Sequence, residues 1–68
     1  MKKQIARVFT NDGVYKVIAH YDTAPIMYEV TLEVCGADGR YHKTCGWEYD
    51  SYLTAMKFIV KQIGVTEG

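Results

Sequence analysis

The chain has 68 residues, with eight lysines and arginines against eight aspartates and glutamates, and its hydrophobic content is 49%. This length fits one compact domain, residues 1–68, and a deep enclosed cavity would remove most of the core that so small a chain needs. We therefore expect a non-enzymatic protein. The neutral charge balance also disfavours nucleic-acid binding, because phosphate affinity depends on an excess of lysine and arginine.

No apolar run of the sequence approaches the roughly 20 residues that a transmembrane helix needs. The segment from Met1 to Arg7 lacks the apolar stretch and the cleavage site of a signal peptide. We therefore expect a soluble protein of the cytoplasm that has no membrane partner.

The first predicted element is a β-hairpin. Residues 4–10 and 14–21 form its strands, and the Asn-Asp-Gly turn at residues 11–13 uses its glycine for a positive φ. Pairing Thr10 with Val14 divides the side chains between two faces, both partly apolar. One face carries Ile5, Arg7, Phe9, Tyr15, Val17 and Ala19, and the other carries Ala6, Val8, Val14, Ile18 and His20.

A second hairpin follows. Residues 28–34 alternate apolar and polar side chains, which is typical of a strand with one buried face and one wet face. A two-residue type I′ turn at residues 38–39 leads to a strand over residues 40–49, with a bulge at Gly46. This register brings the apolar sets of the two strands onto one face. It places Leu32 opposite Cys45, Val30 opposite Trp47 and Tyr28 opposite Tyr49.

The last predicted element is a helix over residues 51–63, with Asp50 as its N-cap. Its apolar stripe consists of Tyr52, Leu53, Ala55, Met56, Ile59, Val60 and Ile63. Phe58 falls about 140° from the centre of this stripe and is expected at the surface. The fold class is therefore α+β: a four-stranded antiparallel sheet of two hairpins with one C-terminal helix packed on one face, in the order ββββα.

One helix covers one face of such a sheet, so the other face meets water or a partner. On the first hairpin this uncovered face is apolar, and an apolar patch on a soluble protein is more often a binding surface than an accident. The alternatives are that these side chains are half-exposed or packed against the Pro25 loop, and that the helix rolls to bury Phe58. The candidate protein-binding residues are Val8, Ile18 and Phe58, with Arg7, Lys16 and Arg40 as a polar rim.

The sequence offers little chemistry. His20, His42, Cys35 and Cys45 are enough in number for a zinc site, but the predicted register places the two cysteines on opposite faces. We expect no metal and no cofactor, with Cys45 in the core and Cys35 as a free thiol. A histidine beside glutamates of the neighbouring strand is typical of ordinary cross-strand pairing, so no catalytic residue is assigned.

In the last two thirds of the chain, a hairpin over residues 28–49 precedes Asp50 and Ser51, which cap a terminal helix whose Ala55 packs on the sheet. This pattern resembles that of very small phage and prophage accessory proteins, including some anti-CRISPR proteins. The resemblance implies a non-catalytic protein that occupies a surface of a larger host or viral complex. The neutral charge departs from the acidic, DNA-mimicking members of this group.

The leading hypothesis is a small non-enzymatic protein-interaction module, a phage-encoded inhibitor that sterically occludes a host defence or nucleic-acid-processing complex. One alternative is a homodimer in which the outer faces of the first hairpin pair, with a structural or regulatory role. Another is a single-stranded nucleic-acid-binding module, because six tyrosines, two phenylalanines and one tryptophan could stack on bases. The register disfavours this last function, since it places most rings on the face that the helix covers.

Overall fold

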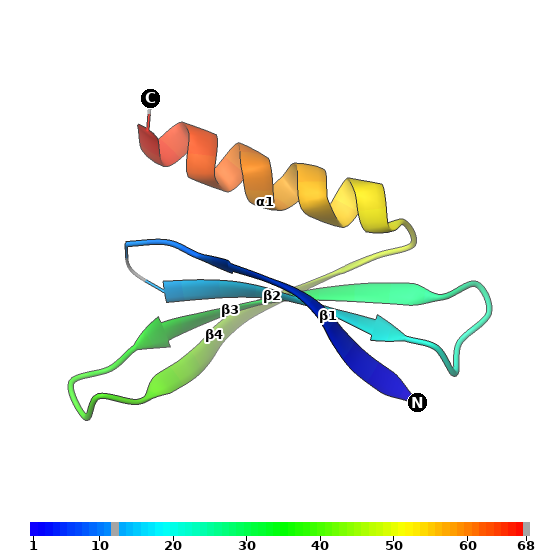
Figure 1. Cartoon of the computed structure of the whole chain (residues 1–68), viewed down its shortest axis with the longest axis horizontal. Helices are drawn as coiled ribbons and strands as arrows, with labels where there is room; N and C mark the ends of the chain where they lie inside the picture. Colours follow the sequence, from blue (N-terminus) through cyan, green and yellow to red (C-terminus); the bar gives the residue numbers. More distant parts are fainter. Residues whose placement is uncertain (12, 68) are drawn as a thin grey trace.

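The computed structural model describes residues 1–11 and 13–67, with side chains described as far as Ile63. Its elements are β1 (Lys2–Phe9), β2 (Gly13–His20), β3 (Met27–Cys35), β4 (Tyr41–Tyr49) and α1 (Tyr52–Glu67). The strands form one antiparallel sheet in the order β1-β2-β3-β4, and α1 lies along one face (Figure 1). The predicted ββββα fold is confirmed.

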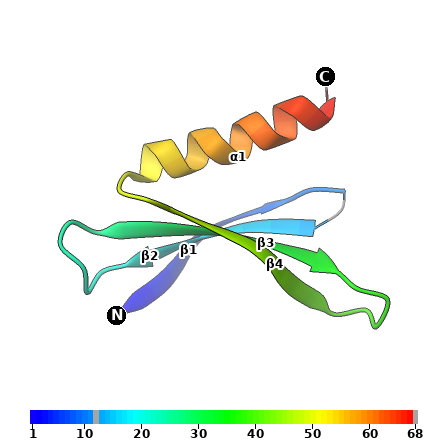
Figure 2. The ribbon, with the colours of Figure 1, turned by 180° about the vertical axis from the view of Figure 1, so that it is seen from behind.

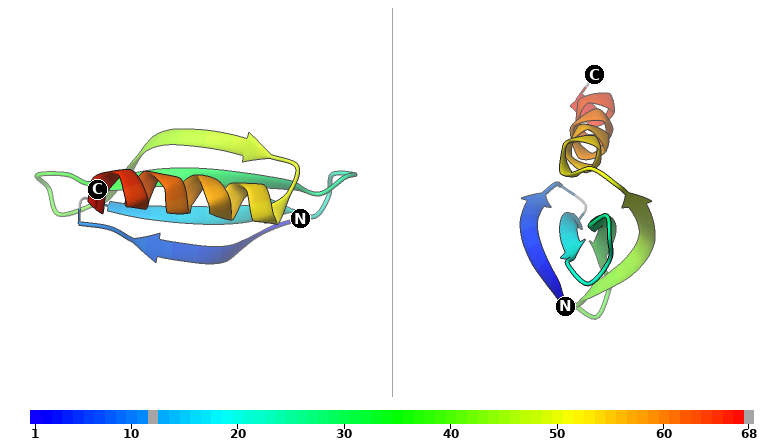
Figure 3. Two further views of the ribbon diagram at one scale, coloured as in Figure 1. Left: turned by 90° about the horizontal axis from the view of Figure 1, so that it is seen from above. Right: turned by 90° about the vertical axis from the view of Figure 1, so that its right-hand side faces the viewer.

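The sheet is strongly twisted, so the edge strands β1 and β4 run in crossing directions when seen from the side (Figures 1 and 2). The helix α1 runs along the length of the sheet above its central strands β2 and β3 (Figure 3), and its backbone comes closest to β3 and β4. No element of the described chain lies over the opposite face, which we call the outer face of the sheet. The molecule is therefore a two-layer structure with one open side.

The core between α1 and the sheet is small. Val17 of β2, Val30 of β3 and Ala55 and Ile59 of α1 form its fully buried centre. Half-buried side chains from all four strands and from α1 surround this centre and exclude water from its edges. Burying a side chain of this size contributes about 1.5–3 kcal/mol, so the attachment of α1 depends on very few residues.

The central register of the second hairpin is as predicted. Tyr28 pairs with Tyr49, Val30 with Trp47 and Leu32 with Cys45. The alternation of apolar and polar residues in β3 fixes this register, because a one-residue slip would move every apolar side chain to the other face.

The tip of the second hairpin is longer than predicted. The N–H of Gly36 donates to the carbonyl of Arg40 at 2.8 Å, which leaves three residues, 37–39, in the loop. Gly39 has a φ of 78°, a left-handed conformation that glycine adopts without a steric penalty. A bulge at Thr44 restores the predicted register beyond the loop, so the bulge expected at Gly46 lies two residues earlier.

The predicted register of the first hairpin is wrong by one residue. Phe9, and not Thr10, pairs with Val14, and the N–H of Thr10 donates to the carbonyl of Gly13 at 2.8 Å. This shift places Ala6 and Val8 on the face that α1 covers, where both pack against the core. The sequence did not decide this register, because both faces of the hairpin are partly apolar.

Gly13 is needed for a different reason from the one expected. It lies within β2, paired with Val34, and a Cβ at this position would collide with the backbone carbonyl of Glu33. The close approach of β2 and β3 thus requires glycine here. Asp12, at the centre of the predicted turn, lies outside the described residues.

The predicted orientation of α1 is also wrong. The ring of Phe58 packs against the rings of Trp47 and Tyr49, with centroids 4.6 and 5.7 Å apart. The helix is rolled toward this aromatic pair, and Leu53 and Val60 are left 62% and 63% exposed. Large rings on the end of β4 offer Phe58 more contact than an aliphatic side chain would gain there. The helix also continues to Glu67 instead of ending at Ile63.

Both cysteines, Cys35 and Cys45, are free and exposed. The expected burial of Cys45 is wrong, because β4 is an edge strand whose only half-buried residues are Trp47 and Tyr49.

None of the helical residues that are described forms a segment long and apolar enough to cross a membrane.

Candidate interaction surfaces

The six candidate residues from the sequence do not form one surface. Val8 and Phe58 were predicted to be exposed and free for a partner. In the structure both side chains pack against the core between the sheet and α1. Ile18 lies on the outer face as predicted and is half-buried between Gln4 and Glu29. Arg40 is exposed at the tip of the second hairpin, an element that carries none of the other five candidates.

The other two candidates, Arg7 and Lys16, lie side by side on the outer face. The guanidinium of Arg7 lies 5.2 Å from the centroid of the exposed Phe9 ring, a distance typical of a cation–π contact. The Nζ atom of Lys16 donates to both carboxylate oxygens of Glu33 at 3.0 Å. Lys16 is therefore engaged within the molecule and does not act as a free polar rim.

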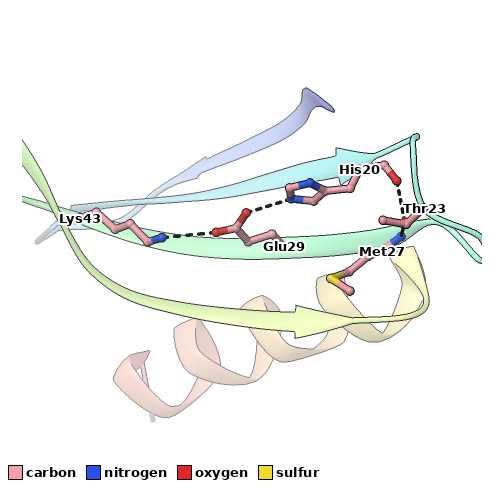
Figure 4. A network of polar contacts seen from close by, with 5 residues as sticks. All are labelled: His20, Thr23, Met27, Glu29 and Lys43. Atoms are coloured by element: carbon pink, nitrogen blue, oxygen red, sulfur yellow. Dashed lines mark hydrogen bonds and ion pairs between the residues drawn. The ribbon is translucent and has the colours of Figure 1, made fainter. Parts of the chain in front are cut away.

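A second polar network crosses the outer face from β2 to β4 (Figure 4). The Nε2 atom of His20 lies 2.9 Å from one carboxylate oxygen of Glu29, and the Nζ atom of Lys43 lies 3.3 Å from the other. Lys43 reaches Glu29 across Gly46, which has no side chain to block it. The bulge at Thr44 explains why Lys43, and not His42, meets the outer-face glutamates.

This network stabilises the charged form of Glu29. The hydrogen bond with His20 is the main cause that lowers the pKa of Glu29 below its ordinary value of 4.5, and Lys43 adds to the effect. At one end of the network Thr23 fixes the loop between β2 and β3. Its hydroxyl donates to the carbonyl of His20 at 2.9 Å and accepts the N–H of Met27 at 3.0 Å (Figure 4).

The centre of the outer face is closed to water. Thr31 is 4% exposed, and its hydroxyl has no hydrogen-bond partner within the described part of the chain. Val14, on the same face, is also buried. Ion-paired and half-buried side chains thus cover the centre of the outer face, and a partner that docked there would have to desolvate them. The apolar outer surface predicted from Ala6, Val8, Val14 and Ile18 is thus not formed by these residues, although Phe9, paired with Val14, is 63% exposed there.

At the turns, two exposed carboxylates have partners of their own. Asp38 accepts the N–H of Arg40 at 3.0 Å and lies 3.1 Å from Nε2 of His42. These two contacts, the backbone one first, lower the pKa of Asp38. The carboxylate of Asp22 lies 3.4 Å from the amino group of Met1, and a backbone hydrogen bond at Asp22 together with this amino group lowers its pKa.

A shallow pocket of about 510 Å³ lies where the β2–β3 loop meets the end of β4. Its apolar wall includes Pro25, Met27 and Tyr49, and its polar rim includes the carboxylates of Glu48 and Asp50. The described residues that line it include no histidine, cysteine or lysine. In the described part of the chain no three potential metal ligands lie together.

The side of α1 that points away from the sheet carries a different combination of residues. Leu53, Lys57, Val60 and Lys61 are all exposed and share this side, which we call the outer flank of α1. Leu53 and Val60 are two turns apart, and Lys57 lies between them. Among the side chains that are described, those of residues 1–11 and 13–63, neither lysine side chain of the flank has an ion-pair or hydrogen-bond partner.

The sequence contained a signal for this flank. The helix has apolar residues on more than one side, so Phe58 competes with Leu53 and Val60 for contact with the sheet. The rings of Trp47 and Tyr49 on the helix-facing side of β4 favour Phe58 in this competition.

Comparison with known proteins adds nothing further, since no family model, curated protein or solved structure matches the chain.

Proposed function

We propose that this protein is a small non-enzymatic protein-interaction module that binds its partner through the outer flank of α1. One observation carries the proposal: Leu53 and Val60 are 62% and 63% exposed on the same side of a helix whose opposite side forms the core. Residues spaced by seven along a helix are the usual anchors when a helix docks into a groove. Burial of each side chain would contribute about 1.5–3 kcal/mol before the costs of association.

The proposed mode of action is steric occlusion of a surface on a larger host or viral complex, such as a defence or nucleic-acid-processing complex. A chain of 68 residues is large enough to cover a binding surface and offers little room for a catalytic cavity. The resemblance to phage and prophage accessory proteins supports this mode of action. The two free cysteines support a cytoplasmic location, where thiols stay reduced.

The alternatives have less support. A homodimer through the outer face of the first hairpin loses two of its expected contacts, because Ala6 and Val8 face α1. Binding of single-stranded nucleic acid needs cations that are free to meet phosphates. On the outer face Lys16 and Lys43 are both engaged by glutamates.

Site-specific photo-crosslinking tests the proposal. A photoreactive amino acid replaces Leu53 in one variant and Glu48, an exposed residue of the outer face, in a second, and both variants are irradiated in the source cell. We expect a specific crosslinked protein from position 53 and none, or a much weaker band, from position 48. Crosslinks from position 48 alone would contradict the proposal.

A further inference from the structure

We infer that the partner of the outer flank of α1 is an acidic amphipathic segment, in which apolar side chains are flanked by carboxylates. This inference rests on the proposed function and specifies the chemistry of the partner at the same surface. It follows from the distribution of paired and unpaired charges over the molecule.

The lysines of this protein fall into two groups. Lys16 and Lys43 on the sheet each bind a glutamate, at 3.0 and 3.3 Å. Lys57 and Lys61 on α1 are exposed and have no partner within the described chain. Lys57 lies four residues after Leu53 and three before Val60 on the helix, and Lys61 follows Val60 directly, so a surface that covers the two apolar side chains also meets both positive charges.

Among the described side chains of α1, as far as Ile63, none offsets these charges. Between Tyr52 and Ile63, α1 contains no aspartate or glutamate. The flank is therefore apolar and positive, although the whole chain has no net charge. Complementary potentials are the usual arrangement across a specific interface, and they require carboxylates on the partner.

The same charges disfavour a second copy of this chain on the flank. Two helices related by a twofold axis, with Leu53 of one packed near Val60 of the other, bring the two Lys57 residues close together near the axis. The described part of the flank has no acidic residue that could separate or neutralise them. Like charges placed together in an interface cost affinity.

A lipid surface fits the flank poorly. Helices that lie in a membrane interface bury a broad apolar face. On α1 the broad apolar face, which includes Ala55 and Ile59, is already buried against the sheet. The remaining apolar strip consists of two side chains about 10 Å apart along the helix axis, a spacing that matches two residues seven apart on a partner helix.

Two synthetic helices of about 20 residues test the inference, since shorter peptides are marginal helices in water. Both carry leucines spaced by seven residues, and the leucines are flanked by glutamates in one peptide and by lysines in the other. Binding to the full chain is followed by NMR, with the methyl groups of Leu53 and Val60 as reporters. At low salt we expect the glutamate peptide to bind at least about fivefold more tightly than the lysine peptide.

Charge reversal provides the sharper arm of the test. The double variant Lys57→Glu, Lys61→Glu should reverse the preference between the peptides. Lys2→Glu, Lys3→Glu, which changes the net charge equally at exposed positions of β1, should preserve it. Circular dichroism of both variants checks that the fold is retained.

Three results would overturn the inference, and each differs from a failure of the proposed function. Equal binding of both peptides at Leu53 and Val60 would show a flank that docks without regard to charge. Self-association that Leu53→Ser abolishes would assign the flank to a second copy. Binding of anionic phosphatidylserine vesicles, lost in Leu53→Ser, would assign it to lipid. The proposed function itself fails only if the crosslinks from position 53 are absent.

Discussion

The outer face of the sheet and the outer flank of α1 are not covered by any other described element. They differ in whether their side chains have partners or are buried within the molecule. On the outer face, Lys16 and Lys43 bind glutamates, and Val14 is buried although no helix covers it. On the flank, Lys57 has no described partner and Leu53 is mostly exposed. A surface that no other element covers is therefore not necessarily a binding surface, because its side chains can form ion pairs with one another and need no partner molecule.

The largest predicted effect is the difference in stability between substitutions at Ile59 and Val60, which are neighbours in the sequence but differ in burial. Ile59 is 1% exposed and Val60 is 63% exposed. Ile59→Ala should lower the free energy of unfolding by about 2–5 kcal/mol, because it leaves a cavity in the core. Val60→Ala should change it by less than about 0.5 kcal/mol. Urea denaturation of the two variants measures both values, and similar losses would contradict the orientation of α1 described here.

A smaller effect, with the opposite sign, is expected on the outer face. Thr31→Val replaces a buried hydroxyl that has no described partner with a methyl group of nearly the same shape. The free energy of unfolding should rise by about 1 kcal/mol, because the cost of a buried unpaired hydroxyl is removed. Thr44→Val, at an exposed position of β4 whose hydroxyl donates to a carbonyl at 3.2 Å, is the control and should give no gain. A destabilised Thr31→Val variant would mean that this hydroxyl is bonded after all.

The smallest effect concerns the pH dependence of the outer-face network. The pKa of Glu29 lies below its ordinary value of 4.5 in the folded chain, so its contribution to stability is present above this value. It is lost as the pH falls through the lowered pKa. Glu29→Gln should reduce the free energy of unfolding at pH 7 by less than about 1 kcal/mol, and the difference from wild type should disappear in acid.

Denaturation of wild type and variant at several pH values below and above 4.5 measures this difference. Glu48→Gln, which removes an outer-face carboxylate without a described partner, is the matched control. A Glu29→Gln difference that persists unchanged in acid would show that the His20 and Lys43 contacts do not stabilise the charged carboxylate.

The fold was more predictable from the sequence than the surface. The alternation in β3 determined both the register with β4 and the face that receives the helix, because Glu29 and Glu33 cannot be buried without partners. In the first hairpin, apolar residues occupy both faces, so the pattern gave no preference between registers. The prediction therefore relied on the assumed turn and paired Thr10 with Val14, whereas Phe9, one residue earlier, is the partner of Val14.

The binding candidates followed from these two uncertain steps. Val8 was assigned to the outer face through the register, and Phe58 was assigned to the surface through the helical wheel. A wheel gives the angles between side chains and not the orientation of the helix on its sheet. That orientation depends on contacts between distant parts of the chain, here Phe58 with Trp47 and Tyr49. The exposed residues Leu53 and Val60 became visible only once these contacts were known.

The central claim is that the outer flank of α1 is the docking surface, and the affinity of the crosslinked partner tests it most directly. With the partner purified, its affinity is measured for wild type, for Leu53→Asp and for the outer-face double variant Lys16→Ala, Glu33→Ala. We expect Leu53→Asp to weaken binding by at least about thirtyfold, as for an interface hot spot, while the outer-face variant binds like wild type. Unchanged affinity of a folded Leu53→Asp variant, with loss of binding in the outer-face variant, would contradict the account.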